Sequence, residues 1–139
     1  MIAAPAGRSG KTTVSIGLCS LFSGMGLKVQ PFKKGPDYID PSWLTAASGS
    51  SCRNLDAFMM GEKRLIGSFE TASPASDIAI IEGNMGLYDG IDKNGKGSSA
   101  HLSRLLKTPV ILVVNTARMN RSIAALVKGY MDFEPDTEI

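Results

Sequence analysis

The chain has 139 residues, of which 43% are hydrophobic, 20% charged and 6% aromatic, and its formal net charge is +2. This length fits one domain, and the near-neutral charge gives no electrostatic reason to expect nucleic acid or an anionic membrane as a partner. The two cysteines, Cys19 and Cys52, are too few for a disulfide scaffold or a zinc site. Neither a signal peptide nor an apolar run of ~18 residues is present, so we expect a cytoplasmic protein.

Strand and helix patterns alternate along the chain. In chain order the predicted elements are a strand stub at 1–3, a helix at 11–25, a strand at 27–32, a helix at 62–71, a strand at 77–81, a helix at 98–107, a strand at 109–114 and a helix at 122–131. Strands 77–81 and 109–114 are almost entirely apolar, which is typical of strands covered on both faces. The alternation predicts an α/β fold in which helices flank a mainly parallel sheet. Residues 85–99 predict a long exposed loop of the kind that often carries function.

Both ends of the sequence lie where a regular element would be expected to continue. The stub at 1–3 is shorter than an ordinary strand, and the final segment, FEPDTEI, stops where another turn and strand would follow. We therefore expect the sequence to be a fragment of a longer protein or an engineered domain.

The strongest local signal is GRSGKTT, which lies between the strand stub and the first helix. It ends as the phosphate-binding loop G-x-x-x-x-G-K-[ST] does, although Pro5 replaces the first glycine. Backbone amides of such a loop converge on phosphate oxygens, Lys11 would bridge two phosphates, and the Thr12 hydroxyl would ligate Mg²⁺. The alternative is a glycine-rich turn with a solvated lysine, but the flanking strand and helix favour nucleotide binding. The predicted phosphate-binding residues are Gly7, Ser9, Gly10, Lys11, Thr12 and Thr13.

Four acidic residues lie near the ends of predicted strands: Asp37, Asp40, Glu82 and Asp89. Ligands of open α/β sheets bind beyond the carboxyl ends of the strands, and Mg²⁺ on a nucleotide needs only one or two protein carboxylates. Glu82 is the first candidate for a metal ligand and Asp40 the second, while Asp37 and Asp89 could bind metal or orient a substrate. The alternative is that all four are solvated loop acids.

Two lysines, Lys33 and Lys34, follow the strand at 27–32. Either could contact phosphate as a point charge, and we include Lys33 among the nucleotide-binding residues. The alternative is that both are surface lysines. His101 is the only histidine, so a triad with a nucleophile is not expected.

Several segments together resemble the cobyrinic acid a,c-diamide synthase family over essentially the whole chain. They are IAAPAGRSGKTT, QPFKKGPDYIDP, RNLDAFM, IIEGNMGLYDG and LVKGY. The resemblance implies a P-loop fold like that of dethiobiotin synthetase. It implies that residues 1–139 are part of an N-terminal ATP-binding domain, with a C-terminal glutamine amidotransferase domain outside this chain.

The same resemblance implies roles for individual residues. Lys11, Asp37 and Asp89 would be catalytic, and Asp37, Tyr38 and Asp89 would lie at the corrinoid carboxylate or its acyl phosphate. Thr12, Asp40 and Glu82 would surround Mg²⁺, and Gly10 to Thr13 would hold the phosphates. The family usually has aspartate where this chain has Asn115, which could alter activity.

By this resemblance the protein is a carbon–nitrogen ligase of cobalamin biosynthesis that uses ATP and Mg²⁺. It would activate the a and c carboxylates of a cobyrinate-type corrinoid as acyl phosphates, for amidation by ammonia from a glutamine amidotransferase, and it could act as a homodimer. One alternative is a nickel-sirohydrochlorin a,c-diamide synthase. Another is a ParA/MinD-like partitioning ATPase, although the additional loop lysine of those proteins is missing between Pro5 and Thr12. We expect the isolated chain to bind nucleotide without turnover.

Overall fold

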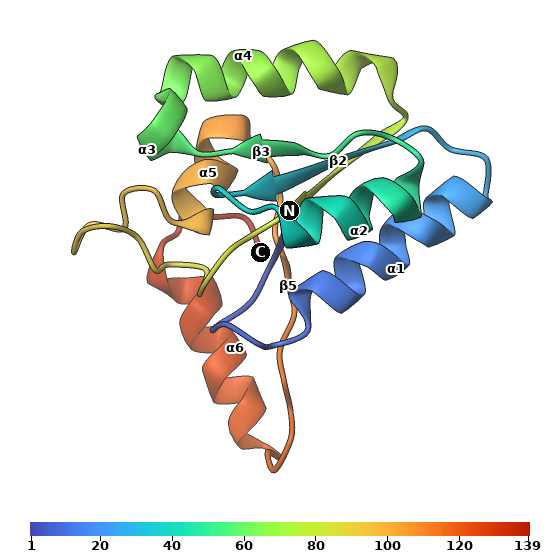
Figure 1. Cartoon of the computed structure of the whole chain (residues 1–139). Helices are drawn as coiled ribbons and strands as arrows, with labels where there is room; N and C mark the ends of the chain where they lie inside the picture. The colour runs from blue at the N-terminus through green and yellow to red at the C-terminus, as the bar shows by residue number, and fades with distance from the viewer.

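A sheet of five parallel strands forms the centre of the computed structural model, which describes residues 1–139 (Figure 1). The strands are β1 (Ile2–Ala3), β2 (Val29–Lys34), β3 (Arg53–Leu55), β4 (Ile78–Glu82) and β5 (Ile111–Leu112). They lie in the order β3-β2-β4-β1-β5, and every neighbouring pair is parallel. The predicted α/β fold with a parallel sheet is confirmed.

Helices cover both faces of the sheet. They are α1 (Lys11–Gly24), α2 (Ile39–Ser48), α3 (Ala57–Met60), α4 (Glu62–Ala72), α5 (Ser99–Leu106) and α6 (Ser122–Phe133), with a short 3₁₀ turn, η1 (Ser73–Ala75), after α4. Helices α1 and α2 pack on one face, and α4 and α5 pack on the other (Figure 1). The four predicted helices are confirmed with small differences in their ends.

The side chains of each strand alternate between two separate cores. Val29 of β2 and Ile80 of β4 pack with Cys19 on the side of α1 and α2. Phe32 and Ile81, from the same two strands, pack on the side of α4 and α5. This period of two also decides which way the last residues of β2 and β4 face, and so it positions the site described below.

Four elements, α2, β3, α3 and the turn η1, were not predicted from the sequence, and one strand was predicted too long. Helix α2 carries Pro41 and polar residues, so its pattern is weak, but proline is tolerated in the first turn of a helix. Strand β3 and helix α3 are too short to show a period. The strand predicted at 109–114 is correct only for Ile111 and Leu112, because its neighbour β1 offers only two residues for pairing.

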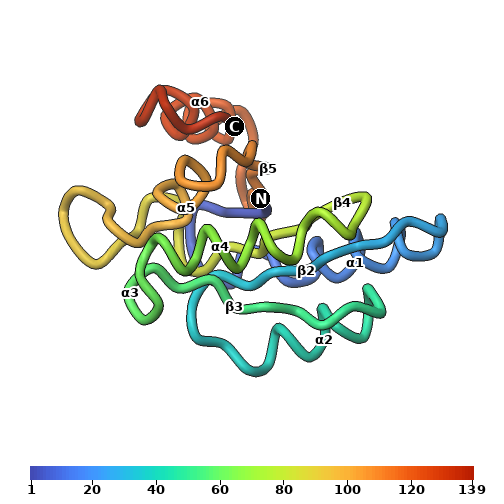
Figure 2. Tube along the Cα trace, turned by 90° about the horizontal axis from the view of Figure 1, so that it is seen from above, coloured from blue at the N-terminus to red at the C-terminus, as the bar shows by residue number.

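Two segments extend away from the sheet. The loop between β4 and α5 protrudes beyond the helices in both orthogonal views (Figures 1 and 2), as expected for residues 85–99. Helix α6 lies beyond β5, the strand at one edge of the sheet, and none of its residues is buried (Figure 2). No helix of the structure combines the length and the apolarity needed to cross a lipid bilayer.

Candidate functional site

The phosphate loop ends in a helix start that is free of competing side chains. Gly10 has φ +93°, a left-handed conformation that favours glycine, and α1 begins at the next residue. No side chain caps this helix, and its first turn contains no acidic residue. Because the first amides of a helix have no partner within it, they remain available to an anion. The Ser9 hydroxyl donates to the Ala6 carbonyl at 3.0 Å and so holds the loop closed from within.

Lys11 joins this loop to the segment that follows β4. Its ammonium donates to the carbonyl oxygens of Ala6 and Met85, both at 2.9 Å. Burial lowers the pKa of Lys11, and the positive charge of Lys33 lowers it further. The two carbonyl groups are neutral, so they leave the charge of the Lys11 ammonium unmatched. A phosphate that enters the loop would match this charge, so Lys11 is well placed to bind a phosphate.

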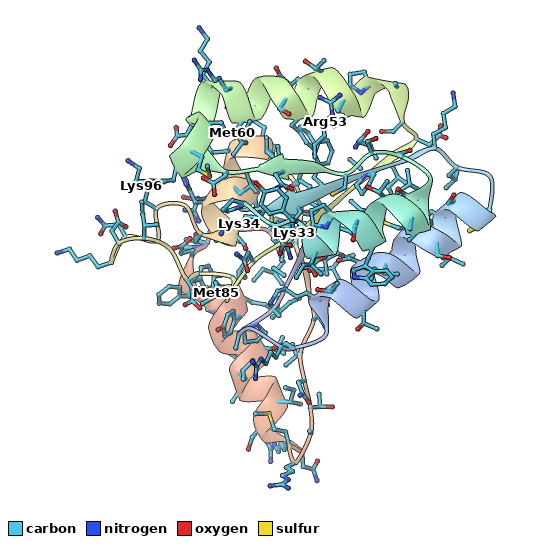
Figure 3. All side chains as sticks on the ribbon, viewed as in Figure 1. Lys33, Lys34, Arg53, Met60, Met85 and Lys96 are labelled. Carbon is cyan, nitrogen blue, oxygen red and sulfur yellow. The ribbon has the colours of Figure 1, made fainter.

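Strand pairing brings Lys33 and Glu82 together at the carboxyl ends of β2 and β4. The two residues are direct partners in the parallel register, and the Lys33 ammonium donates to Glu82 Oε1 at 2.8 Å. The same ammonium donates to Asp40 Oδ2 at 2.6 Å. Burial alone would lower the pKa of Lys33, but the hydrogen bonds to Asp40 and Glu82 raise it instead. Lys33 is only 3% exposed, so its interpretation as a surface lysine is wrong, and its charge is matched by two acids. Figure 3 shows Lys33 near the centre of the molecule.

The three predicted magnesium ligands lie within one hydrogen-bond network. Thr12 Oγ1 donates to Glu82 Oε1 at 2.6 Å, and Lys33 connects Glu82 to Asp40. Glu82 is 1% exposed, so it is not a solvated loop acid. Its second oxygen, Oε2, is buried without any hydrogen-bond partner. A buried carboxylate oxygen without a partner is costly, and a cation would remove that cost, so Thr12, Asp40 and Glu82 fit Mg²⁺.

The phosphate loop and the two acids, Asp40 and Glu82, surround a single cavity of about 420 Å³. Among the residues that line it are Gly7, Ser9, Gly10, Lys11, Thr12, Thr13, Lys33, Asp40 and Glu82. The structure therefore brings together all the residues predicted to bind phosphate or metal. Asn84 and Met85 also line this cavity and were not predicted from the sequence. Their position directly after Glu82 and Gly83, at a strand end, was the signal available for finding them.

The residues predicted to contact substrate lie around this cavity without lining it. Asp37 Oδ1 accepts the amides of Ile39 and Asp40 and so starts α2, while Asp37 Oδ2 lies 3.8 Å from the Lys33 ammonium. Asp89 Oδ2 accepts the Gly86 amide at 3.0 Å in the protruding loop. Tyr38 is 88% exposed. A role for Asp37, Tyr38 and Asp89 at a substrate remains a prediction.

Asn115, which stands where aspartate was expected from the family pattern, lies in the exposed segment after β5. Its Oδ1 accepts the Ala117 amide at 2.9 Å. An aspartate could accept the same hydrogen bond, so the local turn does not require asparagine. The effect of Asn115 on activity stays a prediction.

Replacing Gly86 with alanine tests how tightly the loop after β4 is held against the phosphate loop. A Cβ atom at Gly86 would lie 2.6 Å from the carbonyl oxygen of Pro5, so the two segments must separate. We expect Gly86→Ala to lower the free energy of unfolding by about 1–3 kcal/mol, as overpacking does, and to weaken nucleotide binding. Urea denaturation followed by circular dichroism would measure the first effect.

Gly17→Ala is the matched control for this substitution. Gly17 is exposed in the middle of α1, and a Cβ atom there meets nothing within 4 Å. Alanine at this position is expected to stabilise the protein by about 0.5–1 kcal/mol. Equal stability of the two variants would contradict the close approach at Gly86.

Comparison with known proteins identifies a family and several relatives. A family model described as the CobQ/CobB/MinD/ParA nucleotide binding domain matches residues 1–138. A cobyrinate a,c-diamide synthase from Magnetococcus marinus is 52% identical over 125 residues, which are 90% of this chain and 27% of that protein. One from Syntrophotalea carbinolica is 49% identical over 140 residues, covering 100% of this chain and 30% of the relative.

A third relative has a different macrocycle in its name. It is a hydrogenobyrinate a,c-diamide synthase from Streptomyces coelicolor, 45% identical over 140 residues, which cover 100% of this chain and 29% of the relative. These matches confirm the resemblance drawn from the sequence motifs. The chain spans less than a third of the length of the relatives that it matches.

Proposed function

The chain belongs to the family of CobQ/CobB/MinD/ParA nucleotide-binding domains, and from this premise we propose that it binds ATP and Mg²⁺ to activate a carboxylate of a corrinoid. In this proposal residues 1–139 form part of the N-terminal ATP-binding domain of an a,c-diamide synthase. Ammonia comes from a glutamine amidotransferase domain outside this chain. The names of the similar proteins support the choice of a cobyrinate-type substrate.

One observation carries the proposal: the buried carboxylate of Glu82 contacts Thr12 of α1 through Oε1, and its second oxygen, Oε2, has no hydrogen-bond partner. Thr12 and Lys33 both donate to Glu82 Oε1, and Oε2 is left for a cation. The helix start supplies free amides, and Lys11 supplies a positive charge beside them. A magnesium-bound triphosphate matches this combination of free amides, an ammonium group and an acid, since it carries the complementary charges.

The residue types suit phosphoryl transfer to a carboxylate. An oxygen of the substrate carboxylate attacks the γ-phosphorus of ATP, and the bond to the bridging oxygen breaks, so ADP leaves. Lys11 and the loop amides offset the negative charge that develops on the phosphoryl oxygens during this step. Bound Mg²⁺ would supply further charge neutralisation at the phosphates.

The second step makes the amide and needs no protein nucleophile. Ammonia attacks the carbonyl carbon of the acyl phosphate, phosphate leaves with the bonding electrons, and one proton is released. Asp37, which starts α2 beside Lys33, and Asp89, in the loop after β4, lie on two segments that border the phosphate cavity. We propose that both orient the acceptor carboxylate, because positioning in line with the γ-phosphate is the main contribution that the protein can make.

Product analysis tests this function. Because the relatives are more than three times as long, the reaction is run with a polypeptide extended to their length, given Mg-ATP, glutamine and either cobyrinate or nickel-sirohydrochlorin. Mass spectrometry should show two carboxylates converted to amides on cobyrinate, with release of ADP and phosphate. If only nickel-sirohydrochlorin is amidated, the protein is a nickel-sirohydrochlorin a,c-diamide synthase instead. ATP hydrolysis that responds to DNA or membrane, with no amide formed on either macrocycle, would favour a partitioning ATPase.

A further inference from the structure

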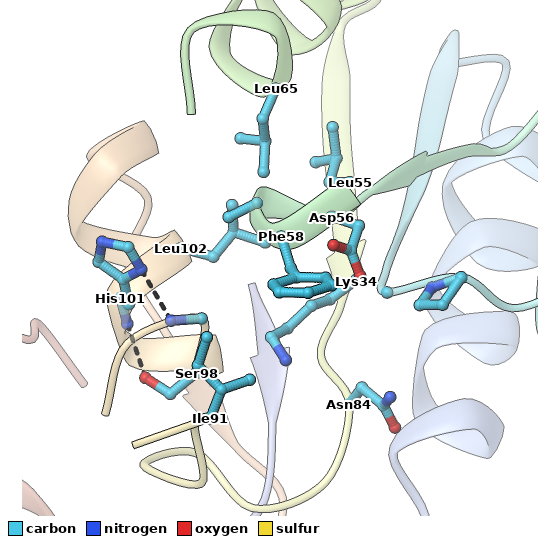
Figure 4. A pocket seen from close by; sticks show the side chains of 14 residues that line it. Lys34, Leu55, Asp56, Phe58, Leu65, Asn84, Ile91, Ser98, His101 and Leu102 are labelled. Atoms are coloured by element: carbon cyan, nitrogen blue, oxygen red, sulfur yellow. Dashed lines mark hydrogen bonds between the residues drawn. The ribbon is translucent and has the colours of Figure 1, made fainter. Parts of the chain in front are cut away.

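A second cavity lies on the opposite face of the sheet from the phosphate cavity, at the same edge. Its volume is about 130 Å³, and β2, β3, α4, α5 and the protruding loop contribute to its lining (Figure 4). Leu55, Leu65 and Leu102 form an apolar wall. Asn84 lines both this cavity and the phosphate cavity, so the two adjoin at this residue. The proposed function uses none of the side chains that lie only in the second cavity.

The alternation of β2 sends its two final lysines to different cavities. Lys33 faces α1 and α2 and pairs with Glu82, whereas Lys34 faces α4 and α5 and lines the second cavity. Lys34 takes part in none of the six ion pairs of the chain. In Figure 4 its amino group points into the space between Phe58 and Ile91. Burial lowers the pKa of Lys34, which is the reverse of the net shift at Lys33, whose charge is matched by two acids.

Three other polar side chains of this cavity each accept a hydrogen bond from neighbouring backbone. Asp56 Oδ1 accepts the Met59 amide, and Ser98 Oγ accepts the amide of His101. His101 Nδ1 in turn accepts the Gly97 amide. These hydrogen bonds hold the cavity walls in place. The one acid among them, Asp56, lies near Lys34 without pairing with it.

Two side-chain nitrogen donors of the cavity lining have no hydrogen-bond partner. One is the Lys34 ammonium, and the other is the side-chain amide of Asn84, whose Oδ1 already accepts the Met85 amide. A Cβ atom at Gly35 would lie 3.3 Å from Asn84 Nδ2, so Gly35 leaves room for this amide beside β2. A cation and an amide N–H₂ next to an apolar wall are the complement of a carboxylate on a hydrocarbon stem.

We propose that this cavity binds a second carboxylate arm of the macrocycle, one that is not being activated, with Lys34 and Asn84 as its donors. The inference rests on the proposed function and deepens it. The volume equals that of about four water molecules in the liquid, so it admits a short carboxylate arm and excludes the ring. Phe58 is 81% exposed and Ile91 is 64% exposed, and both line the cavity, so they offer apolar surface to the ring outside it. Anchoring one arm here would orient the macrocycle toward the phosphate cavity across Asn84.

Equilibrium dialysis against cobyrinate, read by the absorbance of the macrocycle, tests the proposal. Lys34→Met removes the charge and keeps the apolar stem. Lys28→Met is the matched control, because Lys28 is an exposed lysine just before the opposite end of the same strand. We expect Lys34→Met to weaken binding of cobyrinate about 10- to 100-fold, the range for one hydrogen bond to a charged group, and Lys28→Met to leave it unchanged. Affinity for Mg-ATP should be the same in both variants.

A second ligand separates the charge of Lys34 from any structural role. Cobyrinate with all its carboxylates methyl-esterified has nothing to pair with an ammonium, so the wild type and Lys34→Met should bind it equally. If the wild type and Lys34→Met bind free cobyrinate equally, the carboxylate subsite is refuted and the proposed function is not. An equal loss for the ester and the free acid would also refute it. If the wild-type protein binds Mg-ATP but neither cobyrinate nor its methyl ester, the proposed function is overturned, and the subsite with it.

Discussion

Lys33→Met is expected to lower the free energy of unfolding by about 3–5 kcal/mol, the usual cost of leaving one partner of a buried ion pair alone. Lys33 and Glu82 are 3% and 1% exposed, so water cannot replace the lost ammonium. Asp40 would lose its hydrogen bond at the same time. Urea denaturation followed by circular dichroism at neutral pH, without nucleotide, would measure the loss.

A double variant separates loss of the ion pair from loss of packing. Lys33→Met combined with Glu82→Gln removes the unpaired charge, so it should be more stable than Lys33→Met alone. Lys28→Met, which changes an exposed lysine next to the same strand, should unfold like the wild type. If Lys33→Met alone unfolds at the same urea concentration as the wild type, the Lys33–Glu82 pair does not hold the strand ends together as described.

Lys11→Met is expected to weaken binding of Mg-ATP about 100-fold or more. Its ammonium lies at the start of α1, and each hydrogen bond to a charged group is worth about 1.5–3 kcal/mol, so the loss of two such bonds to phosphate reaches this range. Isothermal titration calorimetry gives the affinities directly. Unchanged affinity in Lys11→Met would count against the assignment of the phosphate loop.

The stability of the same variant tests whether Lys11 serves binding or folding. Burial lowers the pKa of Lys11, which means that its charged form is disfavoured in the folded protein without nucleotide. Methionine keeps the stem and removes that charge, so Lys11→Met should be at least as stable as the wild type when no nucleotide is present. A large loss of stability would indicate instead that the hydrogen bonds to Ala6 and Met85 are structural.

Local sequence determined the fold class and the centre of the site. The phosphate loop could be read directly, because GKT before an amphipathic helix makes a free helix start, and this depends only on neighbouring residues. Helices α1, α4, α5 and α6 were predictable because apolar residues recur in them at helical spacing, whereas α2, whose pattern is weak, was missed. Glu82 and Asp40 were found as candidates because they lie near the ends of predicted strands, and the structure places both at the cavity.

Tertiary structure alone decided how these residues pair. Lys33 and Glu82 are separated by 49 positions, and their contact depends on the register between β2 and β4, which no local pattern specifies. The order of the strands also decided that Lys33 meets Glu82 in addition to the nearby Asp40, while its neighbour Lys34 enters a separate cavity with an apolar wall. In the sequence the two lysines are equivalent, and they differ only because successive side chains of a strand point to opposite faces, each covered by its own helices.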